Sequence, residues 1–174
     1  MEKLRLEQFI LEHGEDMLRF AYTYVKKRDV AEDIVQDVLL KAYEKQDQFL
    51  GQSSYKTYLY RMIINRSYDY FRSWHYRNTV LTDRISKIIK KPSVAPTFGD
   101  EDTYLGECIL SLPVKYREVI VLYYYKDFTI DMVANLLSLP ISTVKTRLVR
   151  GREKLKKMLK EEMDYGTFKS EGNY

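Results

Sequence analysis

The sequence predicts an all-α protein in which two small helical lobes are joined by a flexible linker. The 174 residues include only 7 glycines and 4 prolines, and long segments repeat apolar residues every three or four positions, without strand alternation. Residues 91–102, KPSVAPTFGDED, instead combine two prolines, a glycine and three acidic residues, which is typical of a linker. We therefore expect a first lobe at residues 1–90, a linker at 91–102, a second lobe at 103–165 and a frayed tail at 166–174.

Three helices are expected in the first lobe. An apolar stripe predicts the first of them. Asp29 precedes an apolar run and has Glu32 three residues later, a pattern that predicts a helix cap at Asp29. A third helix is expected to begin near Ser53 or Ser54 and to run to about Trp74.

Composition excludes several classes of function. No stretch reaches the roughly 18 apolar residues of a membrane-spanning helix, and the start lacks a signal-peptide pattern, so we expect a cytoplasmic protein. One cysteine and two histidines are too few for a cysteine-based zinc site. The HExxH, GxSxG and glycine-rich phosphate-loop motifs are missing, and Cys108 is expected to be a buried small apolar residue. We therefore expect no enzymatic activity, no metal and no cofactor.

Basic charge is concentrated in the second lobe, where residues 103–160 carry 11 basic and 5 acidic side chains. This suggests an anionic partner. Thr129 is expected to cap a short amphipathic helix that ends before Pro140, because proline cannot donate the helical hydrogen bond. Ser142 or Thr143 can cap a longer, basic helix that reaches about Lys160. This order predicts a helix-turn-helix, although a plain αα-hairpin would show the same apolar pattern.

The residue order in this hairpin is more specific than its apolar pattern. From Thr129 the chain reads TIDMVANLLSLPISTVKTRL, which resembles the DNA-binding region of bacterial sigma factors. Ser138 lies in the turn, where that family often has glycine, and would be strained if its φ is positive. In the family the second helix recognises the promoter −35 element. The resemblance implies this role for Ser142, Thr143, Lys145, Thr146, Arg147 and Arg150.

A second resemblance concerns residues 31–43, AEDIVQDVLLKAY. They are similar to the sigma-factor segment that docks on the clamp helices of RNA polymerase. An acidic face around a leucine can meet a basic coiled coil through charge attraction and an apolar anchor, although an ordinary solvated face would also be acidic. The residues that a helical wheel places on this face are Asp33, Gln36, Asp37, Leu40 and Glu44.

A third resemblance lies at residues 53–72, SSYKTYLYRMIINRSYDYFR. Residues 55–77 contain eight aromatic and five basic residues against one acidic residue. Aromatic rings stack on unpaired bases while arginines contact phosphates, although several rings are expected to pack in the core. The segment closely resembles the promoter-melting segment of extracytoplasmic-function sigma factors, which captures a flipped −10 base. The implied −10 contacts are Tyr58, Arg61, Asn65 for base capture, Arg66, Asp69, Arg72 and Trp74.

Together the resemblances cover nearly the whole chain and imply an alternative sigma factor of the extracytoplasmic-function type. The implied partners are core RNA polymerase, duplex −35 and single-stranded −10 promoter DNA, and an anti-sigma factor. One alternative is a stand-alone helix-turn-helix regulator of duplex operators, which would need a dimerisation surface and a ligand pocket or receiver domain. Another is a polymerase-binding adaptor, which would have no use for the aromatic residues at 55–77.

Overall fold

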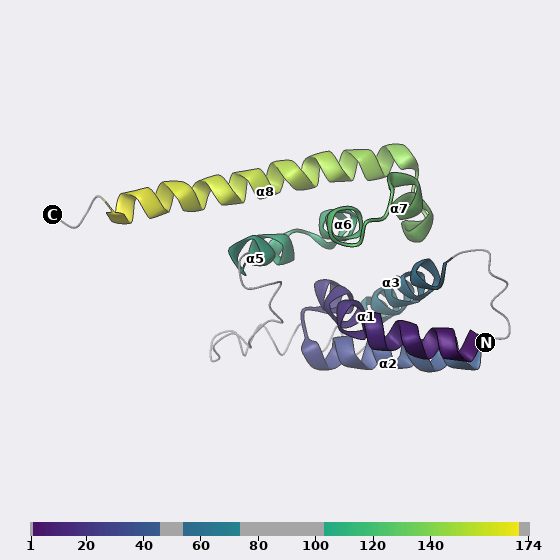
Figure 1. The fold of residues 1–174 in the computed structure, drawn as a ribbon. Helices are drawn as coiled ribbons and strands as arrows, with labels where there is room; N and C mark the ends of the chain where they lie inside the picture. Colours follow the sequence, from purple (N-terminus) through teal and green to yellow (C-terminus); the bar gives the residue numbers. More distant parts are fainter. Residues whose placement is uncertain (1, 46–53, 74–102, 171–174) are drawn as a thin grey trace. The chain divides into compact units, whose positions relative to one another are not determined.

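Helices make up all the regular structure in the described part of the chain (Figure 1). The chain divides into two compact units, Met1–Pro96 and Thr97–Tyr174. The prediction of an all-α protein with two helical lobes is therefore confirmed, while the expected linker lies outside the described residues. The computed structural model describes residues 2–45, 54–73 and 103–170, with the side chains of residues 7–45, 54–73 and 104–160.

The first unit is a bundle of three helices that pack against one another in every pair (Figure 1). They are α1, Glu2–Val25, α2, Arg28–Glu44, and α3, Tyr55–Arg72. Each helix turns one apolar stripe inward, and burial of this stripe is the main source of stability for such helices. The innermost side chains include Met17, Phe20, Val38, Leu59 and Ile63.

Local sequence sets two of the boundaries in this bundle, one as predicted and one not. Ser54 caps α3, because its side chain accepts a hydrogen bond from the Thr57 N–H at 3.2 Å. The cap predicted at Asp29 is wrong: α2 begins at Arg28, and Asp29 lies in its first turn. There its carboxylate still interacts favourably with the positive end of the helix dipole. Arg28 forms an ion pair with Glu32, one turn further on, at 2.8 Å.

The second unit is organised by one long helix, α8, Ile141–Ser170, along which the shorter helices lie (Figure 1). The helix continues ten residues past its predicted end at about Lys160. Gly166 costs about 1 kcal/mol inside a helix, but no proline follows to end it. The shorter elements are α5, Thr103–Ser111, α6, Val114–Ile120, the π-helical turn η2, Val121–Tyr125, and α7, Ile130–Leu137.

Close packing fixes α8 on α6. Val144 and Leu148 are buried on the inner face of α8, as the apolar spacing predicts. A Cβ added at Gly151 would lie 3.1 Å from Ile120 Cγ1, so glycine allows the two helices to approach. Cys108 is buried, as predicted. None of the helices in the described ranges has the length and apolar content to cross a membrane.

Candidate nucleic-acid interface

The hairpin of α7 and α8 is built by a cap and a left-handed turn. Thr129 caps α7, as predicted, and accepts a hydrogen bond from the Met132 N–H at 3.3 Å. Ser138 ends α7 at φ 53° and ψ 47°, a left-handed conformation that costs a non-glycine residue about 1 kcal/mol. The strain foreseen for Ser138 is therefore present. The turn lets the chain reverse within three residues and start α8 at Ile141.

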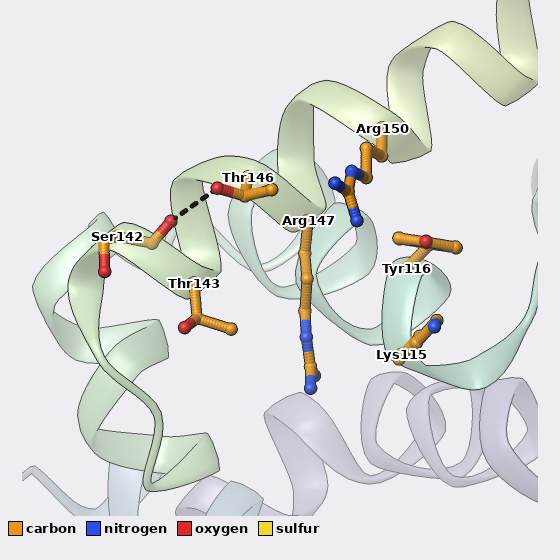
Figure 2. A pocket seen from close by; sticks show the side chains of 7 residues that line it. All are labelled: Lys115, Tyr116, Ser142, Thr143, Thr146, Arg147 and Arg150. Atoms are coloured by element: carbon orange, nitrogen blue, oxygen red, sulfur yellow. Dashed lines mark hydrogen bonds between the residues drawn. The ribbon is translucent and has the colours of Figure 1, made fainter.

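The start of α8 is not capped by Ser142 or Thr143, contrary to the prediction. The N–H groups of Thr143 and Val144 instead bond to the Pro140 carbonyl at 3.0 and 3.1 Å. The Ser142 carbonyl accepts from Thr146 Oγ1 at 2.9 Å (Figure 2). Ser142 and Thr143 therefore lie inside the first turn of α8, and the Thr146 hydroxyl is bonded to the helix backbone.

Five of the six predicted −35 residues line a surface hollow of about 270 Å³ between α8 and α6 (Figure 2). The sixth, Lys145, does not line it and is exposed. Two lining residues that the sequence analysis did not identify, Lys115 and Tyr116, come from α6. The full lining is Lys115, Tyr116, Ser142, Thr143, Thr146, Arg147 and Arg150.

Arg147 has a structural partner. Its Nη1 donates to Oε1 of Glu118 on α6 at 2.9 Å, and the Glu118 side chain is only 2% exposed. A buried carboxylate requires such a partner, because removal from water penalises an unpaired charge by several kcal/mol. Arg147 therefore ties α8 to α6 and also lines the hollow.

The other two cations surround the phenol of Tyr116. Lys115 Nζ lies 5.1 Å from the centre of the Tyr116 ring, and Arg150 lies on the other side of the hollow, close enough to influence the Tyr116 hydroxyl. Loss of solvent alone would raise the pKa of the Tyr116 hydroxyl, but Lys115 and Arg150 together lower it below its ordinary value. The hollow is therefore a place where negative charge is favoured.

On α3, five of the predicted −10 residues fall on one face, opposite the buried stripe. They follow one another at intervals of three and four residues, which places them in a row along a helix. Tyr58 is half-buried and the other four are exposed. Trp74 lies outside the described residues. The row consists of Tyr58, Arg61, Asn65, Asp69 and Arg72.

The aromatic residues of α3 divide between core and surface. Tyr60 is 1% exposed, and its hydroxyl donates to Asp16 Oδ2 at 2.6 Å, which links α3 to α1. This environment raises the Tyr60 pKa, mainly through burial and then through Asp16. Tyr68 packs edge-on against Tyr24. Some rings of the window therefore stabilise the bundle, as expected.

The predicted polymerase-binding residues of α2 lie together on its outer face. Asp33, Gln36 and Glu44 are exposed, and Leu40 is 65% exposed. Asp37 is half-buried; its carboxylate forms an ion pair with Arg66 Nε at 2.6 Å and accepts a hydrogen bond from Lys41 Nζ at 3.1 Å.

These contacts set the charge state of Asp37 and the position of Arg66. Partial burial would raise the Asp37 pKa, but Lys41 and Arg66 lower it overall. Arg66, expected at the −10 surface, is therefore anchored at the edge between α3 and α2. Within the described ranges, no three His, Cys, Asp or Glu side chains come together as a metal site would require.

Comparison with known proteins agrees with this geometry in both units. Residues 9–75 match the family model described as Sigma-70 region 2, and residues 102–155 match Sigma-70, region 4. The ECF RNA polymerase sigma factor SigW of Bacillus subtilis is 33% identical over 160 residues, which cover 86% of each chain. The chain belongs to the extracytoplasmic-function (ECF) sigma factors. It is thus an alternative sigma factor, a non-enzymatic initiation factor that binds core RNA polymerase and directs it to promoters.

Further relatives of this ECF sigma factor also match most of the chain. RNA polymerase sigma factor SigV of Bacillus subtilis is 29% identical over 164 residues, 92% of this chain and 94% of SigV. Among solved structures, the sigma factor RpoE from Bartonella quintana, in complex with the anti-sigma factor NepR, is 30% identical with a TM-score of 0.72. That match covers 88% of this chain and 96% of RpoE. The relatives thus match the ECF sigma factor across both units and not through its helix-turn-helix alone.

Proposed function

We propose that the ECF sigma factor divides promoter recognition between its units, with α3 holding the opened −10 strand and α8 reading the −35 duplex. The observation that carries this proposal is the row on α3, in which Asn65 lies between Arg61 and Asp69 on a face that no helix of the bundle covers. A flipped base needs hydrogen-bonding groups and an aromatic surface. Tyr58 and Asn65 supply these groups, while Arg61 and Arg72 supply phosphate contacts.

The outer face of α2 is the proposed contact with core polymerase. Leu40 would be the apolar anchor, and Asp33 and Glu44 would attract a basic partner. Lys145 would reach base edges in the −35 major groove, because it is exposed and lies in the second turn of α8. The unit around α1–α3 corresponds to the proposed core-binding and −10 lobe, and the unit around α5–α8 to the −35 lobe.

Two further proposals follow from the family. The RpoE complex with NepR supports an anti-sigma factor as a partner of this chain, and a sigma factor works where the polymerase is, which supports a cytoplasmic location. Purified anti-sigma protein should compete with core polymerase for the chain. Simultaneous binding of both proteins without competition would contradict an inhibitory role.

The Asn65→Ala variant tests the −10 assignment. It should bind core polymerase like the wild type but open promoters at least tenfold less, because base capture offsets the unstacking energy. Permanganate reactivity of −10 thymines measures opening, and a core-binding titration measures assembly. Asn135→Ala, an exposed asparagine of α7, is the matched control. Equal loss of core binding and opening in Asn65→Ala would contradict the base-capture role.

A further inference from the structure

The hollow between α6 and α8 is lined by cationic and hydroxyl-bearing side chains. Its seven side chains comprise three cations, Lys115, Arg147 and Arg150, and four hydroxyl groups, those of Tyr116, Ser142, Thr143 and Thr146 (Figure 2). No carboxylate and no aliphatic side chain is part of the lining. A ligand that satisfies such a lining must be negatively charged and rich in hydrogen-bond acceptors.

The charge balance inside the hollow leaves two cations for a ligand. Arg147 is neutralised by the buried Glu118. Within the described part of the chain, neither Lys115 nor Arg150 has an acidic group at ion-pair distance; both instead converge on Tyr116. Lys115 and Arg150 are exposed, so their charges reach the solvent side of the hollow.

The location of the hollow on the recognition helix indicates which anion it would bind. The hollow shares Ser142, Thr143, Thr146 and Arg150 with the surface of α8 proposed to enter the −35 major groove. An anion at this edge of a recognition helix would be a phosphate of the same duplex, and phosphate contacts fix the register of a protein on DNA. Because Lys115 comes from α6, it would act from outside the helix-turn-helix itself.

We propose that the hollow binds one backbone phosphate of the −35 duplex, with Lys115 and Arg150 as its cationic partners and the Tyr116 hydroxyl as a hydrogen-bond donor. This inference rests on the proposed −35 role of α8. Lys115 and Tyr116 are then positioning residues: they hold the DNA in register while other side chains read its bases.

The salt dependence of promoter binding tests the proposal. Each phosphate contact contributes a slope of about −0.9 in log K against log salt, and losing one contact weakens binding equally on all sequences. Holoenzyme with Lys115→Ala should therefore show a slope smaller by about 1, measured from 50 to 200 mM salt on a promoter fragment found by run-off transcription. Over this range the wild type should lose about 3- to 4-fold more affinity than the variant.

The matched control is Lys156→Ala, which removes the same charge from an exposed position of α8 that does not line the hollow. Its slope should equal that of the wild type. Equal slopes for Lys115→Ala and Lys156→Ala would overturn the proposal, because Lys115 would then act only through the net charge of the protein. Tyr116→Phe, which keeps the ring, should weaken binding without changing the sequence preference; unchanged binding would remove Tyr116 from the site.

A series of duplexes locates the phosphate. Each duplex carries one neutral methylphosphonate in the −35 region. At one position, the methylphosphonate should weaken DNA binding by wild-type holoenzyme. At the same position it should not weaken binding by Lys115→Ala holoenzyme any further. Additive losses at every position would overturn the proposal, as would inorganic phosphate that occupies the hollow without competing with DNA. Failure of the wild type to bind any promoter would instead contradict the proposed function itself.

Discussion

The carboxylate of Glu118 is buried in the second unit, and Arg147 reaches it from the recognition helix at 2.9 Å. An ion pair in this setting adds little net stability, but removing one partner leaves a charge in a low-dielectric interior. Arg147 therefore has a structural role whatever it contacts on DNA. Loss of DNA binding in an Arg147 variant would report on folding as well as on recognition.

Arg147→Ala should destabilise the second unit by about 3 kcal/mol, because it breaks the ion pair that Arg147 forms with the buried Glu118 carboxylate. Urea unfolding followed by circular dichroism measures this change. Arg150→Ala, an exposed arginine one turn further along α8, is the control and should change the unfolding free energy by less than about 0.5 kcal/mol. Similar small changes for both variants would contradict the structural role of Arg147.

The outer face of α2 combines an acidic rim with one exposed leucine. A partner that covers Leu40 gains the burial of an apolar side chain, about 1.5–3 kcal/mol when the burial is complete. The acidic residues around Leu40 would mainly raise the association rate and make it depend on salt.

Leu40→Ala should weaken core polymerase binding about tenfold, since central apolar anchors dominate the energy of such interfaces. A fluorescence titration of labelled protein with core polymerase measures the dissociation constant. Leu11→Ala is the matched control, because Leu11 on α1 is 87% exposed and lies outside the proposed face. If Leu11→Ala and Leu40→Ala weaken binding equally, the interface does not centre on α2.

Local patterns predicted the elements better than their exact starts. Ser54 and Thr129 cap helices where the sequence places them, because the side chain of each accepts a hydrogen bond from the N–H three residues later. Asp29 and Ser142 stand near helix starts in the same way, yet both lie inside the helix. In these two cases the backbone supplies the first helical bonds from residues 27 and 140, and a side-chain pattern does not reveal this.

The candidate site could be predicted only where its residues share one helix. The predicted residues on α2, α3 and α8 follow from the resemblance of each segment to sigma factors, and helical spacing places those of α2 and α3 on one face. Lys115 and Tyr116 could not be found in this way, because they reach the recognition helix through the close packing of α6 against Gly151. The pairing of Arg147 with Glu118 is also a contact between helices, and the sequence signal at Arg147, a basic residue on a basic helix, suggested only DNA binding.

At the scale of the whole molecule, charge and chemistry are divided between the two units. The basic excess lies in residues 103–160, which suits duplex DNA, whereas the aromatic and amide groups of α3 suit unpaired bases. The two recognition steps should therefore be separable by mutation, one in each unit.

Run-off transcription on a template with a premelted −10 bubble tests this division most directly. The Asn65→Ala holoenzyme should be impaired on the duplex promoter and substantially restored on the bubble, because the bubble supplies the opening that base capture otherwise drives. The Lys145→Ala holoenzyme should be impaired about tenfold on both templates, since a lost base contact costs about 1–3 kcal/mol. Restoration of both variants by the bubble, or of neither, would contradict the division of promoter recognition between α3 and α8.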